Sequence, residues 1–537
     1  MKTWDMKAGD MKPWLMAAAL LLASCFVAGP CFAGAAAAKG ALVDAARQGD
    51  RAAVLKQIAR KADVNQPSDD GSTALLWAVH NDDAALVHAL IAAKADVKAA
   101  NAYGDTPMRE AAVNGDVEVL AALLDAGGDA DSPSPEGQTS LMIVGHTANL
   151  DAATLLLNHG AKVNAVETYD EQSALMWAAD ERQADMVRLL IAHGADVNAR
   201  SRVHDNDVRV SAEPRVRYDP SGGMTPLLFA AREGCLDCAK ALVQAGAKID
   251  AYDPDGVTPL ILAVWNARFD LASWLVKAGA DVNRWDFWGR TPLWVAVDYD
   301  TIPRGGRPDR PVIDETSSLD LIRQLLAAGA NPNAQLKFAL PFRDVGADRG
   351  GDLMLNTGAS VLLRAAKGGD VEAVSLLLQA GARPELAVAR AWRDQIGGIT
   401  PLMAAAGLAN QINDTRGKLK TQAQAVEVIK LLIAAGADVN ARDDRGDTAL
   451  HGAVYRGWND AVRTLIQNGA DPYLADNNGK SPYDIAKTSP PTARGQIVAV
   501  DPGAAALITQ LRPGKASVNA SPPDHAIGSS KALTGKA

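Results

Sequence analysis

Residues 255–289 read DGVTPLILAVWNARFDLASWLVKAGADVNRWDFWG. Gly256 belongs to a tight turn, where glycine adopts a positive φ without steric strain, and Thr258 and Pro259 are typical of a helix start. The apolar residues that follow are spaced for two short amphipathic helices, and Gly279 is placed to end the second one. Two short helices cannot bury their apolar face alone, so this stretch predicts a stack of similar units.

Copies of this unit recur along the chain. Their helix-opening hydroxyl residues are most often 33 residues apart, at Thr73, Thr106, Thr139, Ser173, Thr225, Thr258, Thr291, Ser360, Thr400, Thr448 and Ser481. The G-x-T-P-L-x-x-A opening and the G-A-D-V-N closing, seen at residues 194–198, 279–283 and 436–440, resemble the ankyrin repeat. The resemblance implies an all-α repeat solenoid of about eleven to twelve stacked repeats, caps included, each with two helices and a hairpin loop.

The repeat pattern defines the expected domain organisation. It extends over residues 41–512 and forms one elongated domain. Longer stretches interrupt the pattern between and within repeats, and we interpret them as insertions near 200–222, 301–316, 334–356, 385–396 and 409–424. Residues 513–537 are rich in Pro, Ala, Gly, Ser and Lys, and are expected to be a disordered tail.

The N-terminus has the composition of a targeting segment. Three lysines precede an apolar run at residues 14–28 that is too short to cross a bilayer, and Ala33 ends a small-residue cleavage site. Residues 1–33 are therefore expected to be a signal peptide that exports a bacterial protein to the periplasm. An alternative is that residues 22–25, which resemble a lipoprotein processing box, make Cys25 a lipidated membrane anchor. The apolar residues after Cys25 do not fit the polar tether expected there.

Composition and motifs argue against several classes of function. The net charge of −9 and the pI near 5.5 disfavour nucleic acid as a partner, because phosphate binding needs a basic field. The sequence contains no nucleophile elbow, zinc-protease, P-loop or dinucleotide-binding motif. We expect a non-enzymatic protein, most simply a monomer, with no catalytic residues, metal site or cofactor.

Two cysteines remain after the expected cleavage, Cys235 and Cys238, at a predicted bend and helix start. One interpretation is structural: a small buried side chain and its neighbour, with or without a disulfide between them. The other is a Cys-x-x-Cys redox pair, since thiols at a helix N-terminus are acidified. Both interpretations stay open at this point.

Aromatic residues are concentrated in one window of the chain. It contains five tryptophans, of which Trp274 and Trp294 occupy positions expected to pack against neighbouring helices. The remaining aromatic residues and two arginines fall at hairpin tips or near the ends of first helices. By resemblance to ankyrin proteins these places line a concave groove where partners bind. The predicted partner-binding residues are Trp265, Trp285, Phe287, Trp288, Arg290, Tyr299 and Arg232.

Two interpretations of this aromatic cluster are open: an exposed surface that binds a partner, or a private core covered by the neighbouring insertions. The first leads to our main hypothesis, a periplasmic scaffold whose groove binds another exported protein. Glycan or small-ligand binding at the tryptophans is an alternative, because sugar rings stack on indole faces. A redox role for Cys235 and Cys238 is another alternative.

Overall fold

The computed structural model describes residues 40–204, 221–301, 314–338, 354–389, 396–408, 420–488 and 503–511. The predicted signal peptide, Cys25 and the predicted tail lie outside these ranges. So does half or more of each predicted insertion. The chain divides into two compact units, each described by itself. Unit 1 comprises Met1–Asp300 and Arg304–Gly351, and unit 2 comprises Thr301–Pro303 and Asp352–Ala537.

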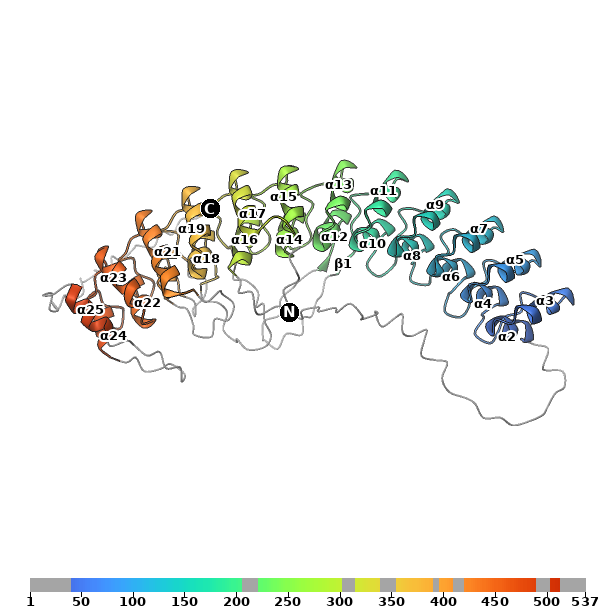
Figure 1. Cartoon of the computed structure of the whole chain (residues 1–537), viewed down its shortest axis with the longest axis horizontal. Coiled ribbons are helices and arrows are strands. Elements are labelled where there is room, and N and C mark those ends of the chain that lie inside the picture. Colours follow the sequence, from blue (N-terminus) through green and yellow to red (C-terminus); the bar gives the residue numbers. More distant parts are fainter. Residues whose placement is uncertain are drawn as a thin grey trace, which may run out of the picture. The chain divides into compact units, whose positions relative to one another are not determined.

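Unit 1 is built from pairs of short helices that follow one another in chain order (Figure 1). Its helices are α2 (Ala41–Arg47), α3 (Arg51–Ala59), α4 (Ala74–His80), α5 (Ala84–Ala92), α6 (Pro107–Asn114), α7 (Val117–Asp125), α8 (Ser140–Thr147), α9 (Leu150–Asn158), α10 (Ala174–Asp180), α11 (Ala184–Ala192), α12 (Pro226–Glu233), α13 (Leu236–Gln244), α14 (Pro259–Trp265), α15 (Phe269–Lys277), α16 (Pro292–Asp300) and α17 (Ser318–Ala327). First helices pack on first helices of adjacent pairs, and second helices on second helices, so the unit has two helical layers.

Unit 2 repeats this arrangement. Its helices are α18 (Val361–Gly368), α19 (Val371–Gln379), α20 (Pro401–Ala405), α21 (Gln422–Ala434), α22 (Ala449–Tyr455), α23 (Asn459–Gln467), α24 (Pro482–Lys487) and α25 (Gly503–Leu511). The same layer-to-layer packing joins α18 to α20 and α19 to α21, and it continues to α24 and α25. The prediction of a mostly helical ankyrin-type solenoid therefore holds for both units.

Local sequence signals produce these helices as expected. The hydroxyl of Thr258 accepts a hydrogen bond from the backbone N–H of Ile261 at 3.3 Å, and Pro259 occupies the first turn. Gly256 in the turn and Gly279 after α15 both have positive φ, at 78° and 93°. The apolar faces of α14 and α15 are buried between their neighbours, which supplies the packing that helices of this length need in order to be stable.

Asparagines at the end of the G-A-D-V-N closing bind successive repeats together. The Asn283 side chain donates to the carbonyl of Gly329 at 3.0 Å and accepts from the N–H of Asn331 at 2.7 Å. The same two bonds are made by Asn65, Asn164, Asn198 and Asn440. This motif is therefore a link between neighbouring repeats as well as a loop signal.

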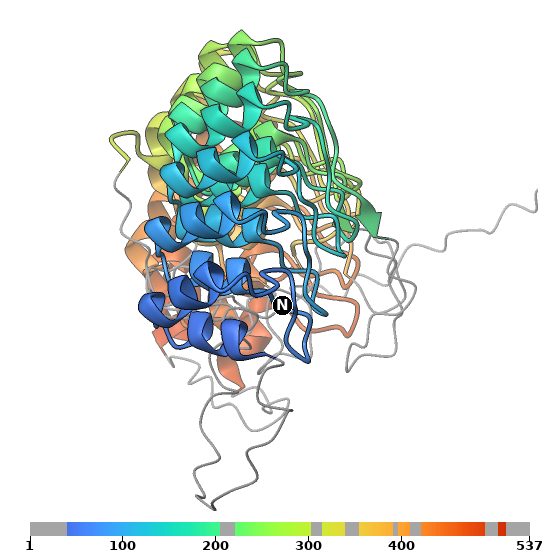
Figure 2. The same cartoon turned by 90° about the vertical axis from the view of Figure 1, so that its right-hand side faces the viewer.

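Where the structure describes the connections, hairpin loops join one helix pair to the next, and in unit 1 they project to one side of the helical layers (Figure 2). Adjacent hairpins are joined by backbone hydrogen bonds, such as Phe287 N–H to the Asp255 carbonyl at 2.7 Å and Lys337 N–H to the Trp288 carbonyl at 2.8 Å. One of these loops contains the short antiparallel pair β1 (Val203–His204) and β2 (Ser221–Gly222). The all-α prediction is corrected to that extent, at the two ends of the 200–222 insertion.

Candidate interaction surface

Exposed and buried side chains alternate along the hairpin that follows α15. Trp285 is 53% exposed and Phe287 is 52% exposed, whereas Asp286 and Trp288 are buried at 1% and 4%. This is the period of two expected of an extended strand with one face on the protein. Trp285 and Phe287 are thus the predicted residues that the structure places at a solvent-exposed hairpin tip.

Two of the predicted contact residues, Trp288 and Arg290, are placed differently from the prediction. Arg290 is only 1% exposed, and its guanidinium lies between the rings of Trp265, at 4.1 Å, and Trp288, at 4.7 Å. The same guanidinium pairs with the Asp286 carboxylate at 2.6 Å. Because they point inward from the hairpin, Trp288 and Arg290 support the surface from beneath. Their burial does not fit the predicted role of direct partner contacts.

Asp286 organises this inner layer and was missed from the sequence. Its carboxylate accepts the backbone N–H groups of Trp288 at 3.0 Å and Arg290 at 2.9 Å, in addition to the Arg290 side chain. Burial raises the pKa of the Asp286 carboxyl, and the adjacent Arg290 charge opposes part of that rise. The D-x-x-G-R pattern of residues 286–290 was the available signal, because the aspartate sits where a turn carboxylate caps its own loop.

Lys337 and Phe338 add to the exposed layer, and the sequence assigned both to an insertion. The Lys337 ammonium lies 3.8 Å from the centre of the Trp285 ring, and Phe338 stacks on Phe287 at 5.0 Å with an interplanar angle of 15°. Phe338 is 51% exposed. Residues 329–333, GANPN, repeat the closing motif, so the following residues take the hairpin register, and that alignment could have identified the pair.

The other predicted residues are not part of this cluster, except Trp265, which is half-buried beneath Arg290. Tyr299 packs edge-on against Phe269 at 5.1 Å near the end of α16. Arg232 on α12 forms ion pairs with Asp180 and, at 3.0 Å, with Glu233. Of the two tryptophans expected in the core, Trp294 is fully buried, whereas Trp274 on α15 is partly exposed.

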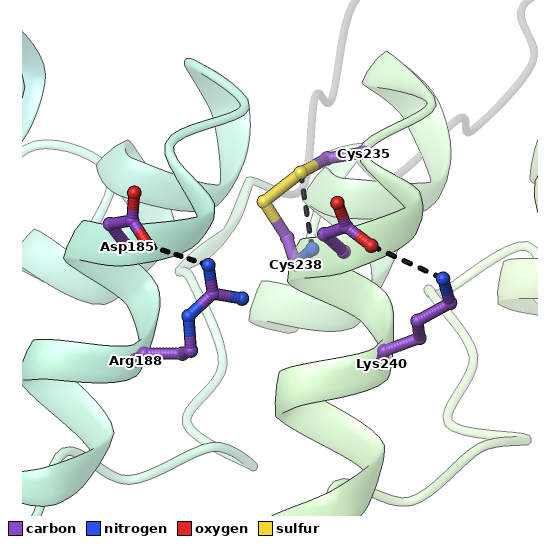
Figure 3. The surroundings of a disulfide bond; sticks show 6 residues. Asp185, Arg188, Cys235, Cys238 and Lys240 are labelled. Atoms are coloured by element: carbon purple, nitrogen blue, oxygen red, sulfur yellow. Dashed lines mark hydrogen bonds and ion pairs between the residues drawn. A yellow bond between two sulfur atoms is a disulfide. The ribbon is translucent and has the colours of Figure 1, made fainter.

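Cys235 and Cys238 are joined by a disulfide at the first turn of α13 (Figure 3). Both side chains are buried, at 6% and 0% exposure. The Cys235 sulfur also accepts the backbone N–H of Cys238 at 3.2 Å, in the place where an Asp or Asn side chain caps other second helices such as α3, α5, α7, α9 and α19. Asp237, between the two cysteines, forms an ion pair with Lys240 at 3.2 Å. The disulfide therefore has the position of a structural cap on α13.

Reduction of this disulfide is expected to lower the free energy of unfolding of unit 1 by about 2 kcal/mol. The effect is at the low end of the usual range because the closed loop is short, with the two cysteines three residues apart. Urea denaturation with and without reductant measures it. A Cys235→Ala/Cys238→Ala variant serves as the control, since reductant must not change its stability. Equal stability of the oxidised and reduced wild type would contradict a stabilising disulfide.

Among the described residues, no group of three or more His, Cys, Asp and Glu side chains is arranged to hold a metal ion. No helix in the described ranges is long and apolar enough to cross a membrane.

Comparison with known proteins identifies the family. The family model "Ankyrin repeats (3 copies)" matches residues 42–134, 110–201, 206–286 and 420–494, more than half of the chain. The chain is an ankyrin-repeat protein. Ankyrin repeats are protein-interaction modules and are generally non-enzymatic, so the exposed hairpin of this ankyrin-repeat protein lies on a scaffold of that kind.

Several relatives share part of this ankyrin-repeat sequence. Human ankyrin repeat domain-containing protein 63 is 37% identical over 131 residues, which are 24% of this chain and 30% of that protein. Mouse protein phosphatase 1 regulatory subunit 27 is 43% identical over 60 residues, 11% of this chain and 39% of the relative. A Treponema pallidum protein described as ankyrin repeat-containing is 35% identical over 133 residues, 22% and 44% of the two chains. The matches thus span less than half of each of these relatives.

Among solved structures, the ankyrin repeat domain of Bcl-3 resembles part of the chain. The alignment covers 42% of this chain and 93% of that one, with 26% sequence identity and a TM-score of 0.35.

Proposed function

We propose that this protein is an exported, non-enzymatic scaffold of a Gram-negative-type bacterium that binds another periplasmic protein at the hairpin tips of unit 1. The observation that carries the proposal is the exposed aromatic cluster of Trp285, Phe287 and Phe338. Each of these side chains is about half exposed, at 51–53%. Large exposed aromatic groups on a rigid support are typical of the energetic centre of a protein interface.

The support beneath the cluster favours binding over chance exposure. Trp285 and Phe287 extend from a hairpin whose inner face is fixed by the buried Asp286–Arg290 pair and by two tryptophan rings. A side chain held in this way loses little conformational freedom when a partner binds, so more of the contact energy is available as affinity. By its name, one relative is a regulatory subunit, which is consistent with a protein that acts through partners.

Two features of the chain support the proposed location. Residues 1–33 have the sequence of a signal peptide, with Cys25 lipidation as the alternative outcome of export. Cys235 and Cys238 form a disulfide, and disulfides persist in oxidising compartments such as the bacterial periplasm. We take each helix pair as one repeat, giving the predicted eleven to twelve with caps, and regard the insertions as elaborations of this scaffold.

Trp285→Ala with Phe287→Ala is expected to weaken partner binding by about a hundredfold or more, because two anchors at the centre of an interface are removed. The test is affinity capture from a periplasmic extract of the host, read by mass spectrometry, followed by calorimetry with the captured protein. Tyr103→Ala with Tyr169→Ala is the matched control, since these rings are 70% and 72% exposed on other hairpins of unit 1. A captured protein that both variants retain equally would remove the basis of the proposal.

Glycan binding at the tryptophans is less well supported. Sugar stacking needs a free indole face, and the Lys337 ammonium lies over the Trp285 ring. The redox alternative is also less well supported, because both cysteines are buried and one of them caps α13. Protein binding therefore remains the proposed function.

A further inference from the structure

Basic and aromatic side chains alternate across consecutive hairpins of unit 1. The Arg200 and Arg284 guanidinium groups lie 5.9 Å and 4.8 Å from the centre of the Tyr252 ring. The Lys337 ammonium lies 3.8 Å from the Trp285 ring. Arg200, Tyr252, Trp285 and Lys337 are exposed and Arg284 is half-exposed. We call these five residues the basic–aromatic row.

Two carboxylates of these hairpins, Asp286 and Asp253, are directed inward, whereas the cations of the row are directed outward. Asp286 is buried and paired with Arg290. Asp253 accepts the N–H of Val257 at 2.8 Å inside its own turn. Burial raises the pKa of Asp253 to about 6, so that the carboxyl is protonated more readily than an exposed aspartate. The outer surface of the row is therefore more basic than the acidic composition of the chain suggests.

Among the described residues, Arg200 and Arg284 form no ion pair, in contrast to arginines elsewhere in unit 1, although the Arg200 charge acts on the carboxyl of Asp253 and opposes part of the burial-driven rise in its pKa. Arg202 pairs with Glu171 at 2.7 Å, and Arg232 pairs with Asp180. Within the described residues, neither Arg200 nor Arg284 lies within ion-pair distance of a carboxylate. Arg200 is instead held in place by the carbonyl oxygens of Gly223, at 2.8 Å, and Tyr252, at 2.7 Å. Its positive charge is fixed in position and is available to a ligand.

The repeat spacing defines what could bind along the row. Packed helices lie about 8–10 Å apart, and an extended peptide rises about 3.3 Å per residue, so one repeat corresponds to about three residues of a bound strand. A peptide with a carboxylate at about every third residue could therefore meet successive cations. Apolar residues between the carboxylates could contact Tyr252, Trp285 and Phe287.

We propose that the basic–aromatic row binds an acidic, extended segment of the partner protein. The inference rests on the proposed function and specifies the chemistry of the partner. Charge complementarity carries it, because outward cations on three of these four hairpins are interleaved with aromatic faces. Arginine and lysine fix the register of the segment through its carboxylates, and the aromatic rings contribute most of the affinity.

The test is selection of a random peptide display library, with inserts of about twelve residues that span about four repeats, on the purified full chain. Selected peptides are expected to be enriched in Asp and Glu at about every third position. Their affinity is then measured by fluorescence anisotropy at several salt concentrations. Arg284→Glu with Lys337→Glu is expected to weaken binding by about tenfold or more and to reduce its dependence on salt.

The charge control is Lys56→Glu with Lys98→Glu, which reverses two exposed lysines away from the row. It should leave peptide affinity within about twofold, since exposed charges beyond a Debye length are screened. Failure to select peptides, selection without acidic enrichment, or equal affinity for the row variant would each overturn the inference. So would alginate binding with the same variant dependence in place of peptides, because the ligand would then be an anionic polysaccharide.

Retention of the periplasmic partner by the two double variants distinguishes failure of this inference from failure of the proposed function. If Arg284→Glu with Lys337→Glu retains a partner that Trp285→Ala with Phe287→Ala loses, the acidic segment is wrong and the scaffold stands. If the alanine variant also retains that partner, the proposed function itself fails.

Discussion

Arg290→Met is expected to lower the free energy of unfolding of unit 1 by about 3–5 kcal/mol at pH 7, because it leaves the buried Asp286 carboxylate without its counter-charge. The two side chains are each 1% exposed and pair at 2.6 Å. Methionine fills much of the space between the Trp265 and Trp288 rings, so the loss reports mainly on charge. Urea denaturation followed by circular dichroism measures the difference from the wild type.

The loss should depend on pH in a defined direction. Burial already raises the pKa of Asp286, and removing Arg290 raises it further. A carboxyl whose folded pKa is raised stabilises the fold below its unfolded pKa, near 3.9, and loses that contribution as pH rises through the folded value. The deficit of Arg290→Met should therefore be larger at pH 8 than at pH 5. Asp253, whose pKa is raised to about 6, is present in both proteins and cancels in the difference.

The matched control is the double variant Asp286→Asn with Arg290→Met. Asparagine keeps an oxygen to accept the N–H groups of Trp288 and Arg290 but carries no charge, so most of the lost stability should return. A deficit that is independent of pH and is not restored by asparagine would show that Arg290 acts through packing alone.

Trp288→Ala is expected to destabilise unit 1 by about 3–5 kcal/mol, whereas Trp285→Ala should change stability by less than about 0.5 kcal/mol. The two tryptophans are three residues apart, but Trp288 is 4% exposed and Trp285 is 53% exposed. Trp288 contacts Arg290 and packs edge-on against Phe287, so its loss leaves a cavity beside a buried charge. Thermal and urea unfolding of the two single variants provide the comparison.

Trp288→Phe is the conservative control and should recover part of the loss, because an aromatic ring still lines the cavity. Partner binding should follow the opposite order, with Trp285→Ala impairing binding in a fully folded protein. If both single variants destabilised the protein equally, Trp285 would belong to the core, and the surface proposed for the partner would not be exposed.

The contrast between Trp285 and Trp288 shows what sequence patterns could and could not predict at the candidate site. They identified the aromatic cluster and its hairpin, but assigned Trp285, Trp288 and Arg290 alike to the predicted partner-binding residues and left open whether the cluster is exposed or buried. Residues 285–288 read WDFW, an order in which hydrophobicity does not separate the exposed Trp285 and Phe287 from the buried Asp286 and Trp288. Only the D-x-x-G-R turn pattern of residues 286–290 indicated that Asp286 faces the protein.

The contacts of Lys337 and Phe338 with the aromatic cluster were missed for a different reason. Lys337 and Phe338 lie about fifty residues along the chain from Trp285 and Phe287, yet they form one layer with them. The backbone bond from Lys337 to the Trp288 carbonyl places them there, and it exists only because the next repeat stacks in register. Such a contact depends on the stacking of whole repeats, so it can be inferred from the sequence only when residues 329–333 are aligned with the closing motif of the other repeats.

By itself, the sequence determined the repeating unit. Turn glycines, helix-capping threonines and apolar faces act over a few residues, so their physics is local and can be read from spacing. Only the tertiary structure decided which hairpin side chains are buried and which cations remain outside. Those outcomes depend on how side chains from successive repeats pack together, which buries Arg290 against Asp286 and leaves Arg284 half-exposed.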